Sequence, residues 1–185
     1  MDLDICNEIA EKVLSDGNHS ENGKFSGSLF NVEYKYAMSF IFRKDGVADL
    51  LSECNYLKPF VDKTVNTDMY NAFYLNALVI KNNNCVERHI DSTLSGWVDT
   101  PITSQKTSVL YLRVPDDIVG GKLNLYEGTD IIRIKPETGK LISFSGETPH
   151  SVSYAFTDHE RISLVLESYY LMEDLYSKIP KYSKD

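Results

Sequence analysis

The feature that most constrains the fold is a series of short apolar runs that fills the chain from about Tyr70 onward. Runs of this length, rich in Val, Ile, Leu, Tyr and Phe, are typical of strands. Gly, Pro, Asp and Ser residues separate them, and regularly spaced turn signals of this kind favour an all-β sandwich or barrel. The predicted strands lie near Phe73–Ile80, Val86–Asp91, Thr107–Val114, Lys122–Tyr126, Ile131–Ile134, Lys140–Phe144, His150–Tyr154 and Arg161–Ser168.

The first part of the chain carries helical patterns instead. Leu3–Leu14 repeats apolar residues at helical spacing, which predicts an amphipathic helix. Asn18–Gly27 is predicted to be a loop and Phe30–Phe42 to form one or two strands. Asp45 is expected to cap a second helix that ends near Pro59. The whole pattern predicts a mainly β protein with N-terminal helices, folded as a double-stranded β-helix, a jelly roll like that of cupins.

Length, charge and hydropathy narrow the possible classes of protein. The 185 residues predict one domain over 1–185, with helical and strand support in 1–70, a jelly-roll core in 71–169 and a C-terminal tail in 170–185. A net charge of −8 without a basic stripe opposes binding to nucleic acid. No apolar run approaches the length of a membrane span, and Met1–Asp4 is acidic where a secretory signal would be basic. We therefore expect no membrane association and a cytoplasmic location.

Two histidines and one aspartate form a metal-ligand pattern. His89 and Asp91 are two residues apart in a predicted strand, so their side chains point to the same side. His150 begins a later predicted strand. Two imidazoles and one carboxylate can bind one face of an octahedral metal and leave the opposite face open, which is the ligand set of non-haem Fe(II) oxygenases. These three residues are the predicted catalytic and metal-binding set.

Arg161 and Ser163 make this pattern more specific. If the strands that contain His150 and Arg161 pair as antiparallel neighbours, Arg161 lies opposite roughly Tyr154, and Ser163 opposite roughly Val152. Both side chains then share the side of His150. A guanidinium binds a carboxylate through two parallel hydrogen bonds, a geometry that lysine cannot reproduce. We therefore expect a keto acid that bridges the metal and Arg161.

Further motifs extend the pattern over more than half of the chain. They are Arg88-His89-Ile90-Asp91, Val109-Leu110-Tyr111-Leu112, Gly120-Gly121-Lys122-Leu123, Pro136-x-x-Gly139-Lys140-Leu141-Ile142-x-Phe144, Pro149-His150-x-Val152 and Arg161-Ile162-Ser163. Over about Phe73–Ser168 the chain resembles the 2-oxoglutarate- and Fe(II)-dependent dioxygenases, and most of all their prolyl 4-hydroxylase-like branch. The resemblance implies iron ligation by His89, Asp91 and His150. It also implies that Arg161, Ser163 and Tyr111 bind the distal carboxylate of 2-oxoglutarate, and that Leu123 lines the pocket.

The resemblance also implies a reaction. Fe(II) and 2-oxoglutarate, with O2, would hydroxylate an unactivated C–H bond and release succinate and CO2, with ascorbate as a reductant. Related halogenases lack the carboxylate that stands here as Asp91, so its presence favours hydroxylation. The expected substrate is a small molecule, an amino acid or a prolyl peptide, and no nucleic acid.

Three further residues are candidates for contact with the substrate, and two other functions compete with hydroxylation. Trp97 lies in a polar segment after Asp91, while Arg113 and Arg133 are cations that could bind an acidic group.

A non-catalytic cupin-like module that binds a metal or ligand is the main alternative function. A nucleic-acid demethylase of the same superfamily would carry a second arginine six residues after Arg161, where this chain has Glu167.

Overall fold

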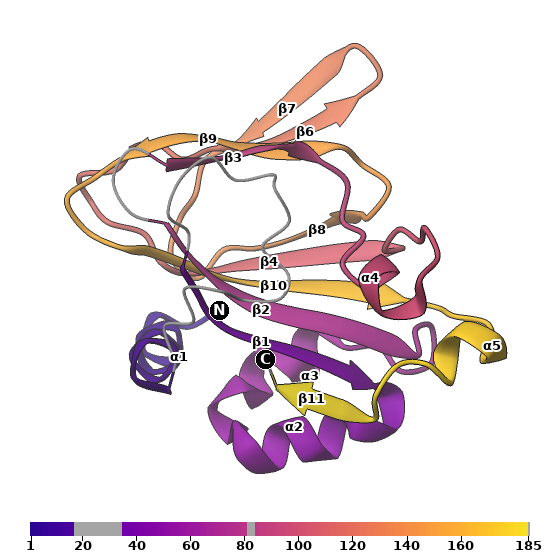
Figure 1. Ribbon diagram of the computed structural model, residues 1–185. Helices are drawn as coiled ribbons and strands as arrows, with labels where there is room; N and C mark the ends of the chain where they lie inside the picture. The colour runs from indigo at the N-terminus through magenta and orange to yellow at the C-terminus, as the bar shows by residue number, and fades with distance from the viewer. Residues whose placement is uncertain (17–34, 81–83, 185) are drawn as a thin grey trace.

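The computed structural model describes residues 1–16, 35–80 and 84–184, and within them the chain folds into two antiparallel β-sheets (Figure 1). The six-stranded sheet contains, in spatial order, β11 (Tyr182–Lys184), β1 (Lys35–Arg43), β2 (Ala72–Ile80), β10 (Arg161–Tyr169), β4 (Lys106–Arg113) and β8 (Leu141–Ser145). The five-stranded sheet contains β3 (Asn84–His89), β9 (His150–Phe156), β6 (Leu123–Glu127) and β7 (Asp130–Ile134), with β5 (Val119–Gly120) paired to β9.

The strand order confirms the predicted jelly roll. Each of the predicted strands after Tyr70 is present, with ends shifted by a few residues at most. In chain order they switch from one sheet to the other, except that β6 and β7 form a hairpin within one sheet. As a result β2, β10, β4 and β8 are neighbours in one sheet, and β3, β9, β6 and β7 in the other. This interleaving winds the chain as a double-stranded β-helix. The additional strands β1 and β11 extend the larger sheet beyond β2.

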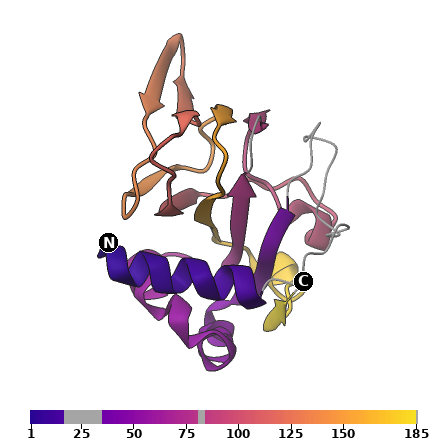
Figure 2. The same ribbon diagram turned by 90° about the vertical axis from the view of Figure 1, so that its left-hand side faces the viewer.

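Helices cover one side of the six-stranded sheet (Figure 2). The helix α1 (Leu3–Asp16) buries Cys6, Ile9, Ala10 and Val13, which confirms the predicted amphipathic helix. The loop predicted at Asn18–Gly27 and the first residues of the strand region predicted at Phe30–Phe42 lie outside the described residues. No helix in the described part of the chain is long and apolar enough to cross a membrane.

The second helical region differs from the prediction. The short helices are η1 (Lys44–Gly46), α2 (Val47–Glu53), η2 (Asn55–Leu57), α3 (Lys58–Thr64), α4 (Ser95–Val98) and α5 (Glu173–Tyr176). Pro59 lies in the first turn of α3, so the expectation that it ends a helix was wrong. A proline lacks an N–H donor, and the first turn of a helix is where that donor has no partner in the helix. Asp45 lies inside η1 and gives α2 no side-chain cap.

The two faces of the six-stranded sheet differ in composition. On the outer face, which the helices cover, alternate residues of β1, β2, β10 and β4 form a continuous apolar core: Met38, Phe40, Phe42, Phe73, Leu75, Ala77, Val79, Ile162, Leu164, Leu166, Leu110 and Leu112. The inner face looks toward the five-stranded sheet. Two separate apolar clusters lie there. One surrounds Tyr74, Tyr169 and Leu94, and the other joins Ile80 to Val86 and Val152 of the smaller sheet.

The expected pairing of the strands that carry His150 and Arg161 was wrong. β9 belongs to the five-stranded sheet and β10 to the six-stranded sheet. Arg161 lies opposite Ile80, and Ser163 lies between Leu78 and Tyr111. The connection between β9 and β10 therefore crosses from one sheet to the other instead of forming a hairpin. Arg161 nevertheless lies inside the molecule, with only 2% of its surface exposed.

Candidate functional site

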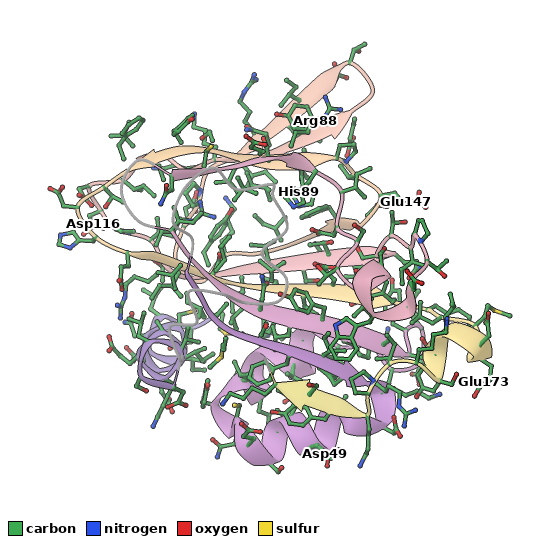
Figure 3. The ribbon with its side chains drawn as sticks, viewed as in Figure 1. Asp49, Arg88, His89, Asp116, Glu147 and Glu173 are labelled. Carbon is green, nitrogen blue, oxygen red and sulfur yellow. The ribbon has the colours of Figure 1, made fainter. Side chains whose placement is uncertain are left out.

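His89, Asp91 and His150, called here the metal-ligand triad, meet at the edge of the five-stranded sheet. His89 ends β3, His150 begins β9, and the two residues are direct cross-strand partners. Asp91 follows β3 by two residues. One potential ligand atom from each residue lies within 4.8 Å of the others. In Figure 3, His89 points toward the space between the sheets, whereas its neighbour Arg88 points to the outside.

Backbone carbonyls fix the orientation of both imidazoles. The Nδ1 of His89 lies 2.8 Å from the carbonyl oxygen of Glu87, and the Nδ1 of His150 lies 3.0 Å from that of Thr148. A carbonyl oxygen can only accept, so each Nδ1 carries the proton and donates it. Each Nε2 then offers its lone pair. These Nε2 atoms lie 3.3 and 3.6 Å from the same carboxylate oxygen of Asp91. Partners of this kind orient histidine ligands in metal sites.

The carboxylate of Asp91 is held on its other side by the six-stranded sheet. Its Oδ2 accepts a hydrogen bond of 2.6 Å from the hydroxyl of Thr107 in β4. Its backbone carbonyl accepts a hydrogen bond from the N–H of Ser104. The ring of Phe144 in β8 packs edge-on against His150, with centroids 4.9 Å apart. Oδ1 therefore faces the two imidazoles from a fixed position.

The three residues of the triad influence one another's pKa values in different directions. Burial by itself favours the neutral form of Asp91, but the hydrogen bond from His89 and the charge of His150 outweigh it and lower the pKa of Asp91. Burial also opposes the charged form of His89, yet the hydrogen bond and charge of Asp91 raise the pKa of His89 overall. For His150, burial is the larger effect and the pKa is lowered. A divalent metal binds the ionised carboxylate and imidazoles with a free Nε2, so a bound metal would replace the proton through which Nε2 of His89 bonds Asp91.

A second group of buried polar side chains, Arg161, Tyr111 and Ser163, lies on the inner face of the six-stranded sheet. We call it the Arg161 cluster. Arg161 donates a hydrogen bond of 2.9 Å from Nη1 to the carbonyl oxygen of Gly121, and its guanidinium lies 4.9 Å from the centre of the Tyr111 ring. Tyr111 and Ser163 are direct cross-strand partners. Burial raises the pKa of Tyr111, although the nearby charge of Arg161 opposes the rise.

Two hydroxyls of the Arg161 cluster lack a partner. The Tyr111 hydroxyl and the Ser163 hydroxyl are buried and make no hydrogen bond within the described part of the chain. A buried polar atom without a partner costs about 1–3 kcal/mol of stability. Two such donors beside a buried guanidinium form a site that a carboxylate satisfies, because a carboxylate accepts several hydrogen bonds and carries the complementary charge.

The other residues singled out from the sequence lie in different surroundings. Leu123 in β6 is buried opposite Val152 of β9. Trp97 in α4 packs against the inner-face cluster around Tyr74. Arg113 forms an ion pair with Glu11 of α1, and Arg133 is exposed on the edge strand β7. The structure therefore groups the triad and the Arg161 cluster between the sheets, and places Arg113 and Arg133 apart from them.

Sequence reasoning missed three residues that shape the site. Thr107 bonds Asp91 and Phe144 contacts His150. Thr107 looked like an ordinary strand residue, and Phe144 belonged to a quoted motif without an assigned role. Gly121 has a φ of +63°, and a side chain there would approach Nη1 of Arg161. Gly120-Gly121 was included among the motifs of the resemblance, but no role was assigned to Gly121. Strand parity relative to Tyr111 would have placed Thr107 on the inner face, because the two are four residues apart in β4.

Comparison with solved structures agrees with this fold. A Pseudomonas putida prolyl-4-hydroxylase is similar with a TM-score of 0.58 and 20% sequence identity, over 93% of this chain and 89% of that chain. A Trichoplax adhaerens prolyl hydroxylase, solved with a hypoxia inducible factor oxygen degradation domain peptide fragment, gives a TM-score of 0.55 at 18% identity, over 90% and 78% of the two chains.

A third similar structure is the viral collagen prolyl hydroxylase vCPH of Paramecium Bursaria Chlorella virus-1, in its 2OG complex. It gives a TM-score of 0.53 at 16% identity, over 92% of each chain. No protein-family model matches the sequence, and no curated protein matches it. The chain thus has the fold of prolyl hydroxylases and other 2OG-Fe(II) oxygenases, which confirms the resemblance at the level of the fold.

Proposed function

We propose that this protein is a 2-oxoglutarate- and Fe(II)-dependent dioxygenase that hydroxylates an unactivated C–H bond. One observation carries the proposal. Two groups of side chains on facing sheets each present unsatisfied binding atoms: the triad offers two imidazole lone pairs and a carboxylate oxygen, and the Arg161 cluster offers buried donors. The first set suits a metal and the second suits a carboxylate, so together they fit a metal-chelating dicarboxylate.

Each residue has a specific role in this proposal. His89, Asp91 and His150 would hold Fe(II), and Arg161 with Tyr111 and Ser163 would bind the distal carboxylate of 2-oxoglutarate. Iron with 2-oxoglutarate and O2 supplies the oxidant for the C–H bond, with succinate and CO2 as products and ascorbate as a reductant. Leu123 would form part of the apolar wall.

The protein contributes position and a dry environment. The bond from Arg161 to the Gly121 carbonyl aims the guanidinium before any ligand binds. Ile80, the cross-strand partner of Arg161, belongs to an apolar cluster that spans both sheets. A charge-assisted hydrogen bond is stronger in such surroundings than in water. Burial of the clustered donors therefore favours a ligand that carries its own negative charge.

Residues 1–185 would act as one domain, with the site in 71–169, the N-terminal support in 1–70 and the tail in 170–185. The substrate would be a small molecule, an amino acid or a prolyl peptide. The Trichoplax adhaerens prolyl hydroxylase, which has a similar fold, was solved with a peptide fragment. This supports the inclusion of peptides among the proposed substrate classes.

The test is the formation of succinate from 2-oxoglutarate by protein reconstituted anaerobically with Fe(II) and then exposed to O2. We expect succinate only when all three are present. Anaerobic addition of 2-oxoglutarate to the Fe(II) protein should also produce the visible charge-transfer absorption of an iron-chelated 2-oxo acid. Metal binding without either signal would instead support a non-catalytic cupin-like module.

A further inference from the structure

One polar side chain interrupts the inner face of β2 without a role in the fold. The strand reads Ala-Phe-Tyr-Leu-Asn-Ala-Leu-Val-Ile, and Asn76 is its only polar residue apart from the hydroxyl of Tyr74. Asn76 is 7% exposed, and its side-chain oxygen finds no hydrogen-bond partner in the described part of the chain. An unpaired amide in a central strand costs about 1–3 kcal/mol, so its presence calls for a ligand.

Strand parity places Asn76 on the same face as the functional groups. The residues on either side of it, Leu75 and Ala77, belong to the outer apolar core. Tyr74 and Leu78 belong to the two separate inner-face clusters, and Asn76 stands in the gap between them. Its direct cross-strand partners are Ser39 of β1 and Val165 of β10. Asn76 thus marks the middle of the inner face.

Its polar neighbours on β10 are Ser163 and Glu167, each two residues from Val165. Ser163 belongs to the Arg161 cluster. Glu167 is 4% exposed and lies directly between Tyr74 and Thr107, the residue that bonds Asp91. Asn76 and Thr107 stand two strands and two residues apart, a separation on the order of 10 Å. That distance leaves room for a substrate of several carbons between Asn76 and the triad.

The surroundings of Glu167 indicate which kind of chemical group the Asn76 side chain would bind. The carboxylate of Glu167 accepts hydrogen bonds from the N–H and hydroxyl of Thr93 and from the hydroxyl of Tyr169, all neutral donors. Burial, followed by the charge of Asp91, raises the pKa of Glu167 to about 8. A cation next to this acid would favour its ionised form and be attracted to it, whereas an anion would keep the acid protonated and gain no such attraction. An amide can turn either its oxygen or its nitrogen to a ligand, and beside this acid the oxygen suits a cation.

We propose that Asn76 accepts a hydrogen bond from a cationic amine of the substrate, with Glu167 as the nearby acid that favours the positive charge. This inference rests on the proposed oxygenase function and names its substrate class: compounds with an ammonium group within several carbons of the oxidised carbon. A prolyl residue inside a peptide has no such group, since its nitrogen is an uncharged tertiary amide. The ammonium could belong to a free amino acid or to a lysyl side chain.

The experiment compares three sets of probes for their ability to stimulate 2-oxoglutarate turnover by the Fe(II) protein. These are the common L-amino acids, a lysine peptide with both termini blocked, and a blocked proline-rich peptide without any amine. We expect stimulation by compounds of the first or second set, and the responding set identifies the source of the amine. Anaerobic calorimetry of the same compounds with the Fe(II)–2-oxoglutarate protein measures binding separately from turnover.

Two substitutions at Asn76 distinguish between its amide acting as a hydrogen-bond acceptor and acting as a donor. Asn76→Leu removes both amide functions, and we expect kcat/KM and the affinity for the stimulating amine to fall about 10- to 100-fold, as for a lost hydrogen bond to a charged group. Asn76→Asp keeps an acceptor and should retain binding. If Asn76→Asp instead behaves like Asn76→Leu, the amide acts as a donor to the substrate and the inference is wrong.

Ser168→Ala is the matched control. The Ser168 hydroxyl is another buried polar atom without a partner in the described structure, but Ser168 lies opposite Phe73, on the outer face of the same sheet. This variant should match the wild type in amine affinity. Stimulation by the amine-free proline peptide alone, no stimulation by any amine, or unchanged kinetics in Asn76→Leu would each overturn the inference. The Fe(II)–2-oxoglutarate absorption band would persist in those cases, and only its absence would reject the oxygenase itself.

Discussion

The two faces of the six-stranded sheet are built from the same strands but satisfy different requirements. On the outer face, every second residue of β2 from Phe73 to Val79, together with Ile162, Leu164 and Leu166 of β10, enters one continuous apolar core beneath the helices. On the inner face, the alternate residues of those strands include Arg161, Ser163, Glu167 and Asn76, and the apolar contacts divide into two clusters. A protein interior gains stability from apolar burial and loses it through unpaired polar atoms. The composition of the outer face therefore suits folding, whereas that of the inner face suits the binding of a polar ligand.

The largest effect should follow from removing a metal ligand. We expect His150→Ala to reduce succinate formation about 1,000-fold or more, because a catalytic metal lowers the barrier by several kcal/mol. Fe(II) affinity, measured by anaerobic titration, should fall with it. His159→Ala, which changes an exposed histidine in the turn after β9, is the control and should keep both. Equal iron affinity in the two variants would remove His150 from the triad.

The Arg161 cluster tests the binding role of the inner face. Arg161→Ala should weaken 2-oxoglutarate binding by about 2–5 kcal/mol, because it removes a buried charged partner of a carboxylate. Arg161→Lys keeps the charge but not the paired hydrogen bonds, so its dissociation constant should lie between those of the alanine variant and the wild type. Calorimetry of the metal-loaded protein measures the difference. An unchanged 2-oxoglutarate requirement in Arg161→Ala would show that the carboxylate binds elsewhere.

Substitutions in the apolar core on the outer face should lower the stability of the protein. Leu164 is buried in β10 among the outer-core residues, one position from Ser163. Leu164→Ala should lower the free energy of unfolding by about 2–5 kcal/mol, through lost burial and the cavity left behind. Denaturant unfolding of the wild type and the variant measures this. Ser163→Ala, on the opposite face, should unfold at the same or a higher denaturant concentration than the wild type. A larger loss of stability in Ser163→Ala than in Leu164→Ala would reverse the comparison.

The smallest expected effect is an increase in stability. Asn76→Leu should raise the free energy of unfolding by about 1–3 kcal/mol, since it replaces an unpaired buried amide with an apolar side chain of similar size. Stability gained at the expense of substrate binding is typical of functional positions. Thermal unfolding of the ligand-free protein gives the answer. A lower melting temperature than the wild type would mean that the amide already serves the fold.

Local sequence patterns predicted much of this molecule because they depend on near neighbours. The apolar runs Phe73–Ile80 and Arg161–Ser168 were enough to locate β2 and β10. The two-residue spacing of His89 and Asp91 was enough to place them on one side. Proline at position 59 was misread because it is compatible with both the end and the first turn of a helix.

Long-range pairing was not predictable in the same way. His150 and Arg161 are close in sequence, and a hairpin was the simplest expectation, yet their strands enter different sheets. Nothing local distinguishes a turn within one sheet from a crossing between two. Asn76 escaped notice for a related reason. Its significance depends on which side of β2 faces the triad, and this becomes known only when Ser39 and Val165 are recognised as its partners.

The separation of the triad and the Arg161 cluster onto opposite sheets has a mechanical consequence. A diacid bound at one end by the triad and at the other by Arg161 would connect the two sheets of the jelly roll. Since a ligand stabilises the form that it binds, occupation should make the two sheets harder to part. A substitution that widens the separation of the two sheets, even one far from the triad, would weaken the binding of both ends of the diacid.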